Sequence, residues 1–133
     1  MYLVVCTRPD LSHTISFLSQ FNKKPTLESW KQAKRVLRYL KGTLDKGLIF
    51  KAKGSNELIG YVDADWANDP TDRKSYTGYV FMYSGGAIAW ESKKQKCVAL
   101  STTEAEYIAA AQAAKEAIYL SNLFKEIMDR CIT

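Results

Sequence analysis

The chain has 133 residues, of which 47% are hydrophobic and 25% are charged, the composition of a globular domain with its own core. Its three cysteines are widely spaced and no apolar run approaches the roughly 18 residues that cross a bilayer, which excludes a disulfide scaffold, a zinc site and a membrane-spanning protein. The 19 basic and 14 acidic residues give a net charge of +5, which favours an anionic partner such as nucleic acid.

Two helices are predicted in the first third of the chain. The first begins near Pro9 and Asp10, which favour a helix start, and apolar residues recur at helical spacing until a break at 22–25. The second begins at Thr26 and stops at Gly42, after a basic last turn. The apolar residues that we expect this second helix to bury are Trp30, Ala33, Leu37 and Leu40.

The opposite face of the second helix is strongly basic. It is either the solvated side of an ordinary amphipathic helix or a contact surface for a nucleic-acid backbone, which it would recognise by phosphate charge without base specificity. The cationic residues of this face are Lys31, Lys34, Arg35, Arg38 and Lys41.

From Gly47 onward the pattern changes to aromatic and β-branched runs between turn residues, which predicts strands joined in hairpins. Turns are expected at 54–56 and at Gly85. We expect three consecutive antiparallel strands to form one sheet. The segments with strand character are 48–50, 58–62, 76–83 and 87–91.

Two acidic segments are the strongest candidates for chemistry. The sequence YVDADW at 61–66 brings a predicted strand to its end at Asp63, and STTEAEY at 101–107 begins a long alanine-rich helix. A carboxylate at the rim of a sheet can hold a hard cation such as Mg²⁺ through its oxygens. The pattern therefore suggests a divalent-metal site, although Asp63 can equally end a strand and cap a turn. We expect Asp65 on the opposite side of the strand, as a turn residue.

The two glutamates of the second segment differ in their expected roles. Ser101 is a natural N-cap, and Glu104 completes a capping box by reaching back to the backbone. Glu106 lies further along the first turns, where it can point into a site or into solvent. The single histidine, His13, lies among polar helix-start residues, so we do not expect histidine catalysis or histidine metal ligation.

Four segments of the chain carry a family pattern: YVDADWA (61–67), RKSYTGYVF (73–81), AWESKKQ (89–95) and LSTTEAEYIA (100–109). In this order they strongly resemble the RNase H region of copia-type LTR retrotransposon Pol polyproteins. Two upstream segments, CTRPDL (6–11) and WKQAKRVLRYLKGT (30–43), resemble the end of the reverse transcriptase of the same polyproteins. The resemblance covers nearly the whole chain.

The resemblance implies an α+β fold. We expect an incomplete RNase H-like fold, with a three-stranded antiparallel sheet and a long packed helix, preceded by two helices. Residues 1–46 would be the C-terminal helical segment of the reverse transcriptase or its connection. Residues 47–133 would be the N-terminal part of the RNase H-like domain.

The activity implied by the resemblance is hydrolysis of RNA in RNA/DNA hybrids by two divalent ions, Mg²⁺ or Mn²⁺. By position, the resemblance assigns Asp63 and Glu106 as the catalytic and metal-binding carboxylates. It also places Ser101 and Thr102 where the family contacts backbone phosphate. The remaining two carboxylates of the family would follow Thr133, so we expect the isolated chain to have weak or no nuclease activity.

The expected partners are an RNA/DNA hybrid and the remaining parts of the polyprotein, with no membrane. An exposed edge of the incomplete sheet would also favour self-association. The resemblance implies a cytoplasmic location in virus-like particles, or a nuclear one. The alternative is a non-catalytic, domesticated remnant that acts as a nucleic-acid or protein interaction module.

Overall fold

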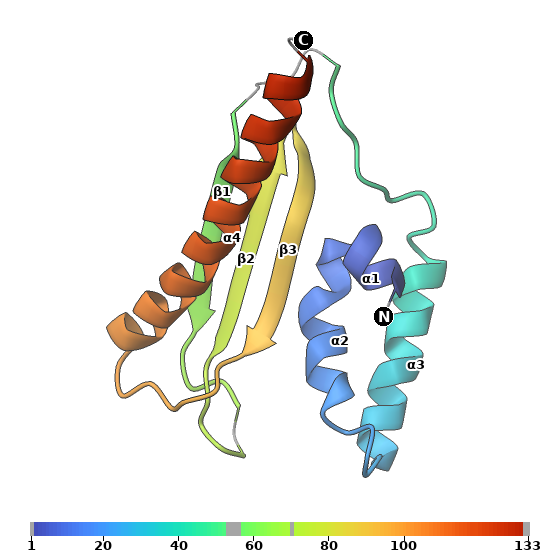
Figure 1. Ribbon diagram of the computed structural model, residues 1–133. Coiled ribbons are helices and arrows are strands. Elements are labelled where there is room, and N and C mark those ends of the chain that lie inside the picture. Colours follow the sequence, from blue (N-terminus) through green and yellow to red (C-terminus); the bar gives the residue numbers. More distant parts are fainter. Residues whose placement is uncertain (1, 53–56, 70, 132–133) are drawn as a thin grey trace.

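A computed structural model describes residues 2–52, 57–69 and 71–131. The fold is α+β, with a three-stranded sheet between one long helix and a group of shorter helices (Figure 1). No helix in the described part of the chain is long and apolar enough to span a membrane. The elements are α1 (Tyr2–Cys6), the 3₁₀ helix η1 (Pro9–Leu11), α2 (Ser12–Ser19), α3 (Leu27–Lys41), β1 (Ile59–Asp65), β2 (Tyr76–Tyr83), β3 (Gly86–Lys94) and α4 (Thr102–Cys131).

The sheet has the order β1-β2-β3, and both neighbouring pairs are antiparallel. Ser84 and Gly85, with φ of 52° and 82°, form the two-residue turn between β2 and β3, which matches the right-handed twist of the strands. The predicted three-stranded antiparallel sheet and long helix are confirmed. The predicted strand at 48–50 is wrong, because that segment forms no ladder, and the turn predicted at 54–56 lies outside the described residues.

Helix α4 packs across one face of β1 and β2 through small side chains. Ala105 and Ala109 are fully buried and Ala113 is nearly so, which places the helix backbone close to the sheet. Further along α4, Leu120 joins Ala113 and Phe81 in a hydrophobic cluster. The alanine-rich sequence therefore serves as the contact face of this helix.

The N-terminal helices lie on the opposite side of the sheet, where α2 packs on β3 and α3 packs on α2 (Figure 1). Val4, Leu11 and Val36 form their hydrophobic cluster. Among the described residues, three α-helices precede the sheet rather than the expected two, because the apolar segment at 2–6 is helical. The expected burial of Trp30 and Leu37 is also wrong: these residues are 59% and 62% exposed, and Val36 is the buried residue of α3.

Lys94 ties the polar loop after β1 to the rest of the fold. Its ammonium lies 2.5 Å from Asp69 Oδ2 and 2.9 Å from Asp72 Oδ1, and it donates to Oε1 of Gln20, the residue that follows α2, at 3.1 Å. Asp69 is only 5% exposed, so its charge depends on this pairing. The hydrogen bond from Lys94, together with one from the Thr71 backbone, holds the pKa of Asp69 below its usual value.

Strand β1 is an exposed edge, since it pairs with β2 alone within the described residues. Its side chains are unusually accessible, with Ile59, Tyr61 and Val62 between 41% and 58% exposed. An accessible edge with free N–H and C=O groups is a template for pairing with another chain. The edge expected from the sequence is therefore present.

We predict that Lys94→Met lowers the free energy of unfolding by about 2 kcal/mol at pH 7, because Asp69 stays buried without its cation. The stability that the ion pair contributes is fully present at a pH above the pKa of Asp69 in the unfolded chain. This stability is lost as the pH falls through the lower pKa that Asp69 has in the folded chain. Urea unfolding at pH 7 and at a pH below the usual pKa of an aspartate carboxyl should thus show a penalty that shrinks on acidification. Lys125→Met is the control, and an equal penalty in both variants would contradict the assignment.

We also predict that the chain self-associates through β1 and that Tyr61→Lys reduces this association, since a lysine on an edge strand opposes pairing. Sedimentation velocity over a concentration series measures the effect. Tyr107→Lys is the matched control, because Tyr107 is 77% exposed and lies on α4 rather than on the edge strand. A wild-type chain that stays monomeric, with a single cooperative melting transition, would rule out the prediction.

Candidate functional site

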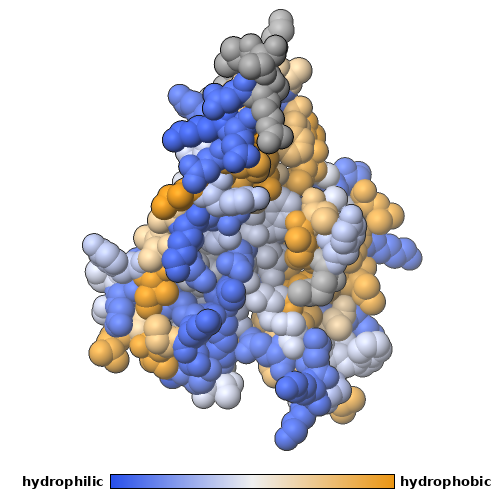
Figure 2. Space-filling model, in the orientation of Figure 1, coloured by the Kyte–Doolittle hydropathy of each residue, from blue (hydrophilic) through white to orange (hydrophobic). Residues whose placement is uncertain are grey.

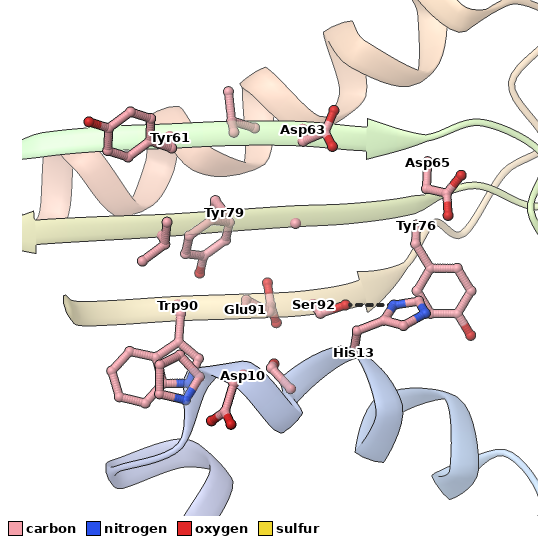
Figure 3. Close-up of a pocket in the computed structure, with 15 residues that line it drawn as sticks. Asp10, His13, Tyr61, Asp63, Asp65, Tyr76, Tyr79, Trp90, Glu91 and Ser92 are labelled. Carbon is pink, nitrogen blue, oxygen red and sulfur yellow. Dashed lines mark hydrogen bonds between the residues drawn. The ribbon is translucent and has the colours of Figure 1, made fainter. Parts of the chain in front are cut away.

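A cavity of about 490 Å³ lies on the face of the sheet opposite α4, between β1 and the start of α2. All three strands contribute to it, and η1 and α2 close one side (Figure 3). The carboxylates of Asp10, Asp63 and Asp65 line it, whereas Glu91 borders it from β3 with a side chain that lies 3.5 Å from Lys93, on the α4 face. No lysine or arginine is among the described residues that line it, so the cavity is acidic in a chain of positive net charge.

Asp63 and Asp65 both line this cavity, and two expectations about them need correction. Strand β1 continues to Asp65, so Asp63, opposite Gly78 in the ladder, lies within the strand rather than at its end. Because side chains alternate along a strand, residues two apart share a face, and the expectation that Asp65 points to the opposite side is wrong. Asp65 also accepts a hydrogen bond from Asn68, whereas Asp63 Oδ1 accepts one from the Ala64 backbone at 2.9 Å.

The N-terminal helices bring His13 to the same cavity. Its Nδ1 lies 3.3 Å from Ser92 Oγ on β3, and its ring meets that of Tyr76 edge-on, as Figure 3 shows. Asp10 is held by Arg8 and Tyr39, and the hydrogen bond from the Arg8 guanidinium lowers the pKa of Asp10 to about 2. The sequence carries no signal for the position of His13, because that position depends on a contact with Ser92, which is far away in the chain.

At the start of α4, Ser101 caps the helix and Glu104 reaches back to the backbone as expected, although its partner is the N–H of Leu100 rather than that of the N-cap Ser101. Ser101 Oγ accepts from the Glu104 backbone N–H at 3.1 Å, and Glu104 Oε2 accepts from the Leu100 backbone N–H at 2.6 Å. Glu106 and Thr102 are exposed in the first turns, and Glu106 is not among the residues that line the cavity of Asp63. The end of β1 and the start of α4 nevertheless lie at the same end of the sheet, where Trp66 Nε1 donates to Ala99 O at 3.1 Å (Figure 1).

The carboxylates of this cavity are chemically suitable ligands for a divalent cation, but too few of them lie close together. Carboxylate oxygens are the ligands that Mg²⁺ prefers, and Mg²⁺ commonly takes only one or two of them from a protein. However, within residues 2–52, 57–69 and 71–131 no group of three or more His, Cys, Asp or Glu side chains could hold a metal ion. Asp63 and Asp65 can therefore begin a metal site, but the described residues do not complete one.

The basic residues predicted to contact nucleic acid do not border this cavity. Lys31, Lys34, Arg35 and Arg38 lie on α3, which α2 separates from the sheet (Figure 1). Lys31 lies 3.8 Å from Glu28, and the Lys34 ammonium lies 5.9 Å from the centre of the Trp30 ring. The structure thus places the acidic cavity and the basic helix in different layers.

Comparison with known proteins shows the family. The chain is 53% identical over 128 residues, or 96% of its length, to the retrovirus-related Pol polyprotein from transposon TNT 1-94 of Nicotiana tabacum. It is 45% identical over 91% of its length to the corresponding polyprotein from transposon RE2 of Arabidopsis thaliana. The chain belongs to the copia-type retrotransposon Pol polyproteins.

The matched region covers 10% of the TNT 1-94 polyprotein and 8% of the RE2 polyprotein. The match to the secreted RxLR effector protein 161 of Plasmopara viticola has 50% identity over 91% of the chain and covers 85% of that protein. No protein-family model matches, and neither does any solved structure. The relationship to copia-type Pol polyproteins therefore rests on sequence identity along nearly the whole chain.

The capping geometry predicts that substitutions of Glu104 and Glu106 differ in their effect on stability. We predict that Glu104→Ala lowers the free energy of unfolding by about 1 kcal/mol, because the Leu100 N–H loses its acceptor at the positive end of α4. Glu106→Ala, the matched control at an exposed position, should change it by no more than about 0.5 kcal/mol. Thermal unfolding of both variants measures the difference, and equal destabilisation would contradict these roles.

Proposed function

We propose that this chain is the first part of an RNase H domain of a copia-type Pol polyprotein, with the end of the reverse transcriptase before it. The domain would hydrolyse the RNA strand of RNA/DNA hybrids in the longer polyprotein. Support comes from the family relationship, from the ordered motifs, and from the element order of three antiparallel strands followed by a long helix. The RNase H-like fold is part of this proposal.

The observation that carries the proposal is the position of Asp63. It lies on the face of β1 opposite α4, in a cavity that other carboxylates share, while α4 begins at the same end of the sheet with Glu106 in its first turns. Glu106 does not line that cavity, so an ion held by both residues would lie at this end of the sheet. In the family pattern, these two carboxylates come from the first strand and the first helix of the domain. The fold gives each residue the type of element that the proposal requires.

Mg²⁺ or Mn²⁺ is the cofactor that we propose, held by Asp63 and Glu106 together with carboxylates supplied by the rest of the polyprotein. When bound, such ions activate water and stabilise the leaving 3′ oxygen. The described residues supply an incomplete set of ligands, so the 133-residue chain should bind these ions weakly. The RNA/DNA hybrid is the proposed substrate, and virus-like particles in the cytoplasm are the proposed location.

The test is cleavage of a labelled RNA/DNA hybrid with Mg²⁺ and with Mn²⁺. We predict that a Pol polyprotein that contains this segment cleaves the RNA strand, and that Asp63→Asn or Glu106→Gln lowers the rate at least about 100-fold. The purified 133-residue chain should show little or no cleavage.

Asp45→Asn is the control, because it makes the same change at an exposed carboxylate outside the cavity. The proposal fails if the polyprotein keeps its cleavage rate in the Asp63→Asn variant, or if Asp45→Asn lowers the rate equally. Hybrid binding without cleavage by the polyprotein would favour a non-catalytic interaction module.

A further inference from the structure

A second cavity, of about 330 Å³, lies between the end of β3 and one side of α4, on the opposite face of the sheet from Asp63. The side of the sheet follows from two contacts. The side chain of Gln95 donates to Thr77 Oγ1 and to the Ala105 carbonyl of α4, so Thr77 faces α4. Lys93 is the partner of Thr77 in the β2–β3 ladder and therefore lies on the same face. The α4 wall runs from Ile108 to Lys115, on positions that share one side of the helix. The described lining residues include four lysines and no carboxylate: Lys93, Lys94, Lys96 and Lys115.

Three of these four lysines can attract a ligand. The ammonium of Lys94 is engaged by Asp69 and Asp72, outside this cavity. Lys93 lies 3.5 Å from Glu91, but the side chain of Lys93 is 52% exposed and solvent weakens that pair. Within the described part of the chain, Lys96 and Lys115 have no ion-pair partner. Figure 2 shows hydrophilic side chains along much of α4, the helix that carries Lys115.

We propose that this lysine cavity binds the phosphate backbone of the nucleic acid on which the protein acts. Ammonium groups are compact charges that bind phosphate oxygens without the planar geometry that reads bases, so the contact would carry no sequence preference.

The lysine cavity is better suited to this role than the basic face of α3. The cavity belongs to the sheet and to the helix that carries Glu106, whereas α3 packs on the far side of α2. Of the cations of α3, Lys34 lies over the Trp30 ring, while solvent weakens the exposed pair of Lys31 with Glu28 as it does the pair of Lys93 with Glu91. The substrate class rests on the proposed function, but binding of the backbone can be measured without cleavage.

The experiment measures affinity for a labelled RNA/DNA hybrid, and for a DNA duplex of the same sequence, by fluorescence anisotropy in EDTA over a salt series. Each lost phosphate contact should lower the slope of log K against log salt by about 0.9. The triple variant Lys93→Ala, Lys96→Ala, Lys115→Ala should therefore lower it by about 2 to 3, for both duplexes. The matching triple lysine-to-arginine variant should restore the slope, and circular dichroism confirms that each variant is folded.

The control variant removes the same charge from α3 through Lys31→Ala, Lys34→Ala and Lys41→Ala. A clearly larger loss of slope in the cavity variant supports the proposal. An unchanged slope in the cavity variant, equal losses in the two variants, or no binding by the wild type at low salt would each overturn it. If the cavity variant loses slope while a Pol polyprotein that contains this segment fails to cleave, the binding site stands and the proposed nuclease function fails.

Discussion

The close approach of α4 to the sheet is the constraint on which the candidate sites depend. Ala105 and Ala109 have no exposed surface, and a side chain at Gly60, on the same face of the sheet, would meet the Phe81 ring at 2.5 Å. Larger residues at these positions would lift the helix away, because a packed interface cannot absorb added volume without strain. That spacing sets both the position of the α4 start beside β1 and the lysine cavity between α4 and β3.

Local features of this fold could be predicted from the sequence because their causes are local. The Ser101 and Glu104 caps act within one turn of a helix, and the turn at Gly85 needs only residues that accept positive φ. The segment at 48–50 shows the limit of such reasoning. It has strand composition, but near it the Lys51 N–H bonds to the Ser84 carbonyl without a ladder being formed, and no local pattern distinguishes these outcomes.

The candidate site could be predicted only in part for the same reason. A motif identified Asp63, but the partners of its cavity depend on tertiary packing, such as the contact between His13 and Ser92. The expected side of Asp65 was wrong for a strand that continues, because residues two apart on a strand share a face. The buried face of α3 was likewise decided by its packing on α2, which selected Val36 over Trp30.

Positive and negative side chains are unevenly distributed between the two faces of the sheet, which the net charge of +5 does not reveal. The cavity around Asp63 is acidic, so a polyanionic backbone gains nothing there unless cations compensate the carboxylates. The lysine cavity on the other face of the sheet offers attraction without chemistry, since no carboxylate lines it among the described residues. The two faces of the sheet therefore differ in charge, and α4 is the element that borders the lysines and carries Glu106.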